Sequence, residues 1–548
     1  MQWRLSSATL IPRYALDFTG ITSWVGRRFR DLLCISLILF APTVTRAQDK
    51  ESNCAKAQPL LTAAQQAIDV KDSQAAIDQL NRAIQIAPQC ADAFVLLGLT
   101  EFHNGATADA IQHYQEALQL QPHSYSAHYD LALAYLKDLQ LEKARAQLEE
   151  AVKLDPNQAD ATYNLGIVLQ EMGQFSQALE KFRQARVLDA KRPDVAFNIV
   201  RTELDLQRIA AARTEAKQSA THFGTDPQWS TAIGQLFLKT GHPKDAVPYL
   251  QNAFRVRPTD VELRHSLAVA YLQSGQPNEV LLTIPDPKTS DDFYLRASAY
   301  YLSHRFPEAD RESQRSLDLA PESSQILVLR TRLLQRAGNQ NEALETAKRA
   351  ITLAPDWDQP YYLAGVSSYL LRLYEDAVTN VNRALQLNPK SARALFVQYV
   401  ALANLGKLDE AEASLRRAIS LDPTNARLYC HLGILLERED KHEQAEHFFK
   451  KAIELKPQYA LSHYELGKLW AGSDRLRPAT LELQVAIKCD PGFSAAYYQL
   501  GRIYMKLGEA KRSERMLAEF NRLHKEDLQD PGDDQAHEDD ARKETEAQ

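Results

Sequence analysis

The sequence predicts an all-α fold, an α-solenoid of about fourteen stacked two-helix units, from three observations. A hydrophobic-x-Pro ending recurs at steps of 34 residues within two long runs, and alanine stands five and twelve residues before most of these prolines. Glycine often stands twenty-four residues before them. Small residues at fixed places on two amphipathic segments indicate helices that pack closely together. The prolines are Pro88, Pro122, Pro156, Pro321, Pro355, Pro389, Pro423, Pro457 and Pro491.

Each unit has the same order of elements. The first helix carries the glycine, a loop that often contains a second glycine follows it, and proline ends the second helix. The units begin near residues 57, 91, 125, 159, 193, 227, 261, 290, 324, 358, 392, 426, 460 and 494.

Three units depart from this pattern. The unit at 193–226 has Val200 at the glycine position and lacks the final proline. The unit at 261–289 is five residues short, and its second helix runs into an Ile-Pro-Asp-Pro stretch at 284–287. We interpret that stretch as a bend or boundary between a first subarray, 57–289, and a second, 290–525. The last unit has Phe520 at the alanine position and no proline, as a terminal cap would.

The repeated unit resembles the tetratricopeptide repeat (TPR). Clear examples are "AFVLLGLTEFHNGATADAIQHYQEALQLQP" (93–122) and "YCHLGILLEREDKHEQAEHFFKKAIELKP" (429–457), and the resemblance covers residues 57–525. It implies a right-handed superhelix whose first helices line a concave groove that binds extended peptides or folded partner proteins. It also separates this chain from glycosyltransferases that append a catalytic domain to such an array, since the units leave no room for one.

The N-terminus has the features of a secretory signal peptide, residues 1–47. Arg27, Arg28 and Arg30 precede an apolar run at 32–41, which is too short to span a bilayer core of roughly 30 Å. We expect cleavage after Ala47, a linker at 48–56, and export to the periplasm or outside the cell, with no stable membrane span afterwards. An uncleaved N-terminal membrane anchor is the alternative.

Four cysteines remain after residue 47. Cys54 and Cys90 lie at the ends of adjacent units and could pair in an oxidising compartment, but unpaired buried thiols fit the sequence as well. At the other end, residues 526–548 contain ten acidic and two basic residues and are expected to be a disordered tail. No basic face or stripe indicates nucleic-acid binding.

The motif His442-Glu443-Gln444-Ala445-Glu446-His447 is superficially like a zinc-protease helix. Its two histidines are five residues apart rather than four, which turns them about 140° from each other on a helix, and Ala445 occupies a packing position. No phosphate-binding loop or nucleophile elbow is present. We therefore expect no enzyme activity, no metal and no cofactor. A hydrolase with a site hidden in the groove is the remote alternative.

The candidate partner-binding residues lie at the fifth position of the first helix, which usually points into the groove in TPR proteins. Aromatic side chains there could form binding hot spots or could simply pack against neighbouring repeats. At the sixth position, three successive units carry side chains able to pair with a partner's backbone: Asp130, Asn164 and Asn198. The fifth-position residues are Tyr129, Tyr163, Phe197, His265, Tyr294, Tyr362, Phe396, Tyr464 and Tyr498.

The charges expected in the groove change along the chain. The second position of the first helix is acidic in early units and becomes arginine at 393 and 427. Arg332, Lys468 and Arg502 also tend inward in the later half. No unit has lysine at the fifth position, which argues against the type of TPR groove that grips a peptide's C-terminal carboxylate. The sequence thus predicts a non-catalytic scaffold for protein or peptide partners in the cell envelope. The alternative is an accessory factor in polysaccharide or envelope export.

Overall fold

The computed structural model describes residues 54–529, with side chains described up to residue 524. The expected signal peptide at 1–47, most of the linker at 48–56 and residues 530–548 of the expected tail lie outside this range. Within it, the chain forms twenty-eight α-helices and no strand. They follow one another as fourteen pairs, which confirms the predicted all-α solenoid of about fourteen two-helix units.

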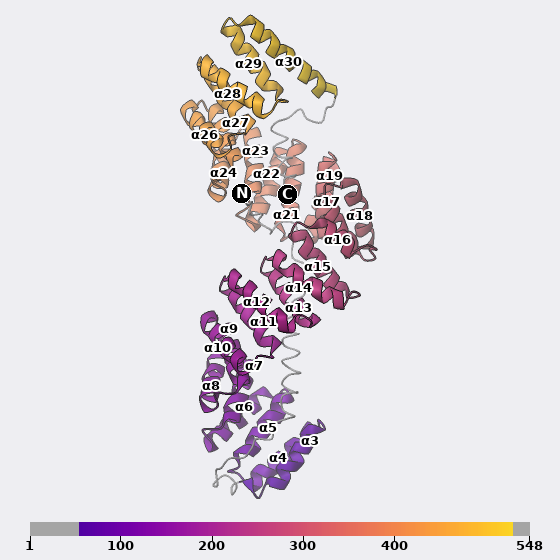
Figure 1. Ribbon diagram of the computed structural model, residues 1–548, viewed down its shortest axis with the longest axis vertical. Coiled ribbons are helices and arrows are strands. Elements are labelled where there is room, and N and C mark those ends of the chain that lie inside the picture. The colour runs from indigo at the N-terminus through magenta and orange to yellow at the C-terminus, as the bar shows by residue number, and fades with distance from the viewer. Residues whose placement is uncertain (1–53, 530–548) are drawn as a thin grey trace. The chain divides into compact units, whose positions relative to one another are not determined.

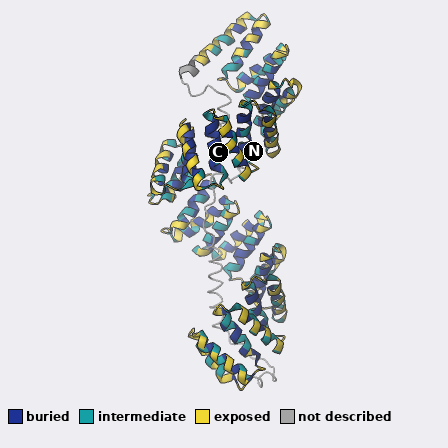
Figure 2. Ribbon diagram, turned by 180° about the vertical axis from the view of Figure 1, so that it is seen from behind, coloured by how far each residue is buried: buried dark blue, intermediate teal, exposed yellow. Residues whose placement is uncertain are grey.

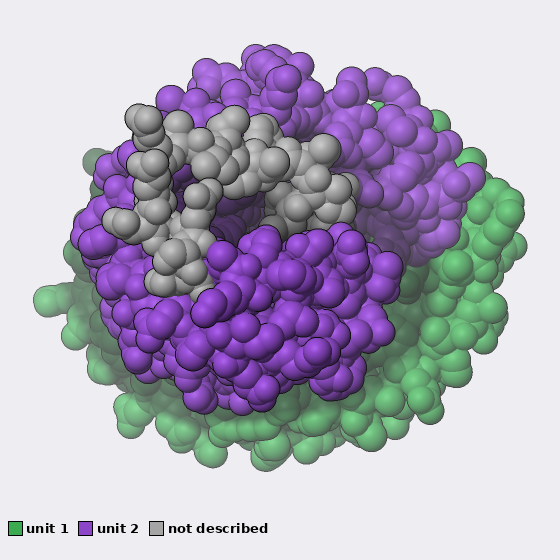
Figure 3. All heavy atoms as spheres, turned by 90° about the horizontal axis from the view of Figure 1, so that it is seen from below, with its two compact units in different colours: residues 1–12, 277–548 green, residues 13–276 purple. Residues whose placement is uncertain are grey.

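The helices divide into two compact units, which Figure 3 colours separately. Unit 2 ends at Gln276 and unit 1 continues from Pro277, so the division lies inside the short repeat at 261–289. Unit 2 contains α3 (Gln58–Asp69), α4 (Ser73–Ile86), α5 (Ala91–His103), α6 (Thr107–Leu120), α7 (Tyr125–Lys137), α8 (Leu141–Leu154), α9 (Ala159–Glu171), α10 (Phe175–Leu188), α11 (Pro193–Asp205), α12 (Ile209–Phe223), α13 (Pro227–Lys239), α14 (Pro243–Val256) and α15 (Val261–Gln273).

Unit 1 begins with a short helix and ends with the longest one. Its last helix, α30, includes the first four residues of the stretch that the sequence assigns to the tail, 526–529. The helices are α16 (Pro277–Thr283), α17 (Ser290–Leu302), α18 (Phe306–Leu319), α19 (Ser324–Arg336), α20 (Gln340–Leu353), α21 (Asp358–Leu370), α22 (Tyr374–Leu387), α23 (Ala392–Asn404), α24 (Leu408–Leu421), α25 (Ala426–Arg438), α26 (His442–Leu455), α27 (Ala460–Gly472), α28 (Leu476–Cys489), α29 (Ser494–Lys506) and α30 (Ala510–Gln529).

Small residues let the two helices of a repeat approach closely. Within each unit, helices that follow one another in the chain lie side by side (Figure 1). Ala411 and Ala418, twelve and five residues before a proline, are completely buried on α24. On α25, a Cβ added to Gly433 would lie 2.5 Å from the Phe449 ring of α26. Figure 2 shows the resulting pattern, with buried residues on the faces that helices turn toward one another.

The turn between the two helices of every repeat contains one residue with positive φ. Glycine, which adopts this conformation at no steric cost, fills seven of the fourteen places. The places recur every 34 residues, except that Gly275 and His304 are 29 apart, which locates the five missing residues of the short repeat. The fourteen are Lys71, Gly105, Leu139, Gly173, Gln207, Gly241, Gly275, His304, Gly338, Arg372, Gly406, Asp440, Asp474 and Gly508.

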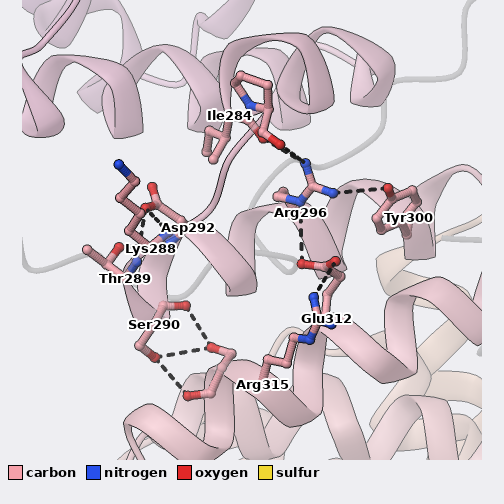
Figure 4. A network of polar contacts seen from close by, with 11 residues as sticks. Ile284, Lys288, Thr289, Ser290, Asp292, Arg296, Tyr300, Glu312 and Arg315 are labelled. Carbon is pink, nitrogen blue, oxygen red and sulfur yellow. Dashed lines mark hydrogen bonds and ion pairs between the residues drawn. The ribbon is translucent and has the colours of Figure 1, made fainter.

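The arginine Arg296 on α17 stabilises the chain where the short repeat lacks helical turns. Its guanidinium donates to the carbonyl oxygens of Ile284 at 2.7 Å and Pro285 at 3.4 Å (Figure 4). Its Nε lies 3.3 Å from Oε2 of the buried Glu312 on α18. α17 itself starts from a capping box closed by Thr289. The irregular stretch after α16 is therefore hydrogen-bonded to unit 1 although it forms no helix.

A disulfide joins Cys54 and Cys90. Cys54 precedes α3, and Cys90 is the residue before α5, so the bond connects the two ends of the first repeat. Of the two possibilities that the sequence leaves open, the structure has the paired one.

Reduction of this disulfide is expected to loosen the first repeat selectively. The bond closes a loop with a sequence separation of 36 residues, and constraining such a loop in the unfolded chain contributes about 3–4 kcal/mol. The first repeat has a neighbour on one side only. Hydrogen exchange measured with and without reductant should therefore accelerate in α3 and α4 and stay constant in α25 and α26. Equal exchange in α3 and α4 under both conditions would contradict this role.

Within residues 54–529, no helix combines the length and apolar composition that crossing a membrane requires.

Candidate groove sites on the first helices

The first helices of the repeats form the concave side of each unit. In unit 2, α5 contacts α7, and α13 contacts both α11 and α15; in unit 1, α21 contacts α19 and α23, and α27 contacts α25 and α29. Second helices of successive repeats make no contacts of comparable extent, so each array bends toward its first helices. We call these two faces the unit 2 groove and the unit 1 groove.

Most of the aromatic residues expected to line the grooves are buried in the chain. Only Tyr498 is well exposed, at 40%, with its ring 5.2 Å from that of Phe520. Tyr129, His265 and Tyr464 are partly exposed. The other five are less than 10% exposed and pack against neighbouring helices: Tyr163, Phe197, Tyr294, Tyr362 and Phe396. A partner-binding role for the nine stays a prediction, and burial restricts direct contact chiefly to the four with accessible surface.

The asparagines at the sixth position connect successive repeats. Nδ2 of Asn164 donates to Oη of Tyr129 at 2.9 Å, and Nδ2 of Asn198 donates to Oη of Tyr163 at the same distance. Asn198 also donates to the backbone oxygen of Asp194. Both amides are buried. Each amide thus donates at least one hydrogen bond within the chain, and pairing with a partner's backbone stays a prediction. The 35-residue spacing from tyrosine to asparagine, which the sequence analysis did not use, is the signal that could have predicted this contact.

Asp130 occupies the sixth position one repeat earlier but has no such contact. The residue 35 positions before it is Val95, which cannot hydrogen-bond through its side chain. Among the described residues, the Asp130 carboxylate has no hydrogen bond or ion pair. Burial raises the pKa of Asp130 to about 7. The unit 2 groove therefore contains a partly exposed carboxylate that the protein itself leaves unmatched.

This shift predicts a pH-dependent cost to stability. Because the pKa of Asp130 in the folded chain lies above its usual value near 4, folding takes up a proton between about pH 4 and 7. The free energy of unfolding therefore falls as the pH rises through that interval. We expect Asp130→Asn to raise it by about 1–2 kcal/mol at pH 8, after allowing for the partial exposure, and to leave it nearly unchanged at pH 4. Urea titrations at both pH values measure the difference; Asp92→Asn, which removes an exposed groove charge, is the control.

Two expected groove acids of unit 2 are neutralised by an arginine that sequence reasoning missed. Arg192, which immediately precedes α11, lies 2.5 Å from Oδ1 of Asp160 and 2.7 Å from Oδ2 of Asp194. Its guanidinium also lies 4.4 Å from the centre of the Tyr163 ring, in a cation–π contact. These contacts of Arg192 join residues of two successive repeats. They therefore stabilise the packing of the two repeats and reduce the negative charge of this part of the groove.

In the unit 1 groove, the expected cation Lys468 lies between two carboxylates. It pairs with Glu465 on its own helix and, at 3.3 Å, with Glu437 on α25. Glu465 is buried, and its burial raises its pKa. Close by, the partly exposed Tyr464 ring packs 4.8 Å from Phe493. The positive charge predicted for this half is therefore partly compensated within the chain.

The remaining candidate features lie outside the grooves. His442 and His447 are exposed on α26 while Ala445 is buried, as the five-residue spacing predicts. In the part of the chain that the structure describes, no three potential metal ligands lie together. A shallow depression of about 340 Å³ lies on α10, bordered by Leu179, Arg183 and Val187. Because α10 is a second helix, this depression is on the outer side of unit 2.

Stacked helix pairs with a concave face of first helices define the class of helical-repeat binding proteins. One tetratricopeptide repeat model matches residues 61–125, 163–227 and 231–279, a second matches 426–459 and a third matches 482–515. A TPR repeat model matches 140–173 and 401–440. Together these matches cover more than half of the sequence. The chain belongs to the tetratricopeptide repeat family.

Solved structures that match this chain have little sequence in common with it. The APC/C hetero-tetramer Cut9–Hcn1 matches with 15% identity over 82% of this chain and 97% of that chain, at a TM-score of 0.42. Yeast Tom70 matches with 16% identity over 83% and 95%, at 0.34. MamA matches with 22% identity over 30% and 96%, at 0.28. No curated protein sequence matches this chain.

Proposed function

We propose that this protein is a non-catalytic scaffold that binds partner proteins along its grooves in the cell envelope. The observation that carries the proposal is that both concave faces present accessible aromatic side chains. Tyr129 is partly exposed in unit 2, and Tyr498 is exposed in unit 1. Aromatic rings on rigid helices supply large contact area at low entropic cost, which is the usual basis of binding hot spots.

Two features support export. The N-terminal sequence has the basic flank and short apolar run of a signal peptide. The Cys54–Cys90 disulfide suits an oxidising compartment, where such bonds persist. Cell fractionation combined with thiol alkylation tests this part. The protein should be recovered outside the cytoplasm, starting at Gln48, with both cysteines protected from alkylation until reduction. A cytoplasmic protein with both thiols alkylated would contradict it.

Affinity purification from an envelope extract tests the groove. The full chain serves as bait beside a groove variant, Tyr129→Ala with Tyr498→Ala. The control variant, Val187→Ala with Leu481→Ala, removes exposed apolar side chains from second helices, where these residues are 85% and 63% exposed. Circular dichroism confirms that all baits are folded.

A partner protein retained by the wild type and the control but lost by the groove variant is the expected result. Equal retention by all three would contradict groove binding. Recovery of a polysaccharide in place of a protein would instead favour an accessory factor in polysaccharide export.

A further inference from the structure

Two hydrogen bonds between successive first helices of unit 2 follow one rule. A fifth-position tyrosine accepts from the sixth-position amide 35 residues later, in Tyr129–Asn164 and in Tyr163–Asn198. The next step toward the N-terminus would pair residue 95 with residue 130. There the chain has Val95 and Asp130, so both members of the pair differ from the rule. The aspartate is left with an apolar neighbour in place of a phenol.

Asp130 stands out among the acidic residues of unit 2 that are not exposed. Asp160 and Asp194 are paired with Arg192, and Glu101 on α5 lies 2.7 Å from Nδ1 of His113 on α6. Asp130 has no corresponding partner among the described residues. Holding a carboxylate in a partly desolvated place without a counter-charge costs stability. A residue with such a cost and no structural partner is a candidate for binding a ligand group.

A second polar group beside Asp130 is also unmatched. The hydroxyl of Tyr114, on α6, is completely buried and makes no hydrogen bond to the described residues. Burial and then the nearby charges of Asp130 and Glu101 raise the pKa of Tyr114 above its usual range. A buried hydroxyl without a partner is uncommon, because it loses its hydrogen bonds to water. The Tyr114 hydroxyl is too deeply buried to contact a ligand itself, and it leaves the Asp130 carboxylate without a hydrogen-bond donor.

Aromatic rings lie next to this place. Tyr125 and Tyr129, one helical turn apart on α7, stack with ring centres 5.8 Å apart and an interplanar angle of 9°. Their positions put both phenols within electrostatic range of the Asp130 carboxylate. Stacked tyrosines favour a cation and the aliphatic stem that carries it. Carboxylate, phenol oxygens and aromatic faces together suit a basic side chain rather than an acidic or an apolar one.

We propose that Asp130, flanked by Tyr125 and Tyr129, is the subsite of the unit 2 groove that binds a lysine or arginine side chain of an extended partner segment. The subsite rests on the proposed function, since it requires a protein partner in the groove. The cation supplies the counter-charge that the fold omits at this position, and its ion pair with Asp130 determines the register of the segment along α7.

A library of random displayed peptides, selected on the full chain, tests the subsite with a defined probe. Peptides bound by the groove should share a lysine or arginine at one position. Asp130→Asn, which keeps the shape and removes the charge, should weaken the selected peptides about 30-fold or more, as loss of one member of an enclosed charge pair does. Asp92→Asn on α5, another groove acid, is the matched control and should leave the affinity nearly unchanged.

A double-mutant cycle distinguishes an ion pair from an indirect effect. Replacing the shared basic residue of a selected peptide by norleucine should cost as much as Asp130→Asn, and combining the two changes should cost little more. If Asp130 serves only as a structural partner of Tyr114, then Tyr114→Phe and Asp130→Asn will alter stability but not peptide selectivity. That result would overturn the subsite.

The outcomes separate this inference from the proposed function. Peptides that bind the groove but share no basic residue, or that bind wild type and Asp130→Asn equally, overturn the Asp130 subsite and leave groove binding intact. Peptides that bind equally well to the chain carrying Tyr129→Ala and Tyr498→Ala overturn the groove itself. A shared basic residue that depends on Asp130 supports both.

Discussion

Replacing Gly433 by valine is expected to lower the stability of the array around α25 and α26 by about 3 kcal/mol or more. Even a single Cβ at this position would lie 2.5 Å from the Phe449 ring, which is completely buried and has no room to move. The larger side chain must therefore separate the two helices of the repeat. Urea denaturation followed by circular dichroism measures the loss.

Gly472 provides the matched control for this substitution. It ends α27, and a Cβ added there would meet nothing within 4 Å. Gly472→Ala should change stability by no more than about 1 kcal/mol, in the stabilising direction, because alanine restricts the unfolded chain. A comparable loss for both variants would mean that the close contact between Gly433 and Phe449 does not explain the need for glycine.

Arg296→Ala is expected to destabilise the start of unit 1 by about 3–5 kcal/mol. The substitution removes the enclosed partner of the Glu312 carboxylate, whose side chain is only 9% exposed, and leaves it with the more exposed Arg315 at 3.8 Å. It also removes the hydrogen bond to the carbonyl oxygen of Ile284 (Figure 4). Thermal and urea unfolding of the full chain, with hydrogen exchange in α16 and α17, measure the effect. Arg296→Lys should recover little of the loss, since an ammonium cannot bond to several oxygens in one plane.

Arg305→Ala is the control for this second prediction. Arg305 forms an ion pair with Glu308 at the surface, where its side chain is 50% exposed, and water and salt screen such pairs so that they add little to stability. If Arg305→Ala proves as damaging as Arg296→Ala, the junction after α16 does not depend on the enclosed network.

The fold could be predicted from the sequence because every repeat carries the same residues at the same local positions. Proline, alanine and glycine at fixed intervals determine where each helix ends and where two helices touch. The 34-residue interval of positive φ, with its contraction to 29 residues between Gly275 and His304, follows the same pattern. Residues other than glycine that adopt positive φ in these turns, such as Leu139, were not predicted individually. Their position in the repeat requires this conformation.

The site could be predicted only in part. The sequence pointed to the first helices, yet most of the aromatic residues it selected, such as Phe396, are buried in the stack. Contacts between repeats, such as Arg192 with Asp160 and Lys468 with Glu437, depend on which rotamers long side chains adopt. Periodicity does not encode those choices. Asp130 shows the complementary case, because the sequence grouped it with Asn164 and Asn198 while the structure shows that it lacks their partner.

Site-specific photocrosslinking in the native host tests the groove account most directly. A photoreactive amino acid is placed at Tyr125 and Tyr498 on first helices and, as a comparison, at Val187 and Leu481 on second helices. The account predicts that one partner protein is captured from the first-helix positions and not from the second-helix positions. Capture of that partner from Val187 or Leu481 alone would contradict it and place the binding surface on the outer face.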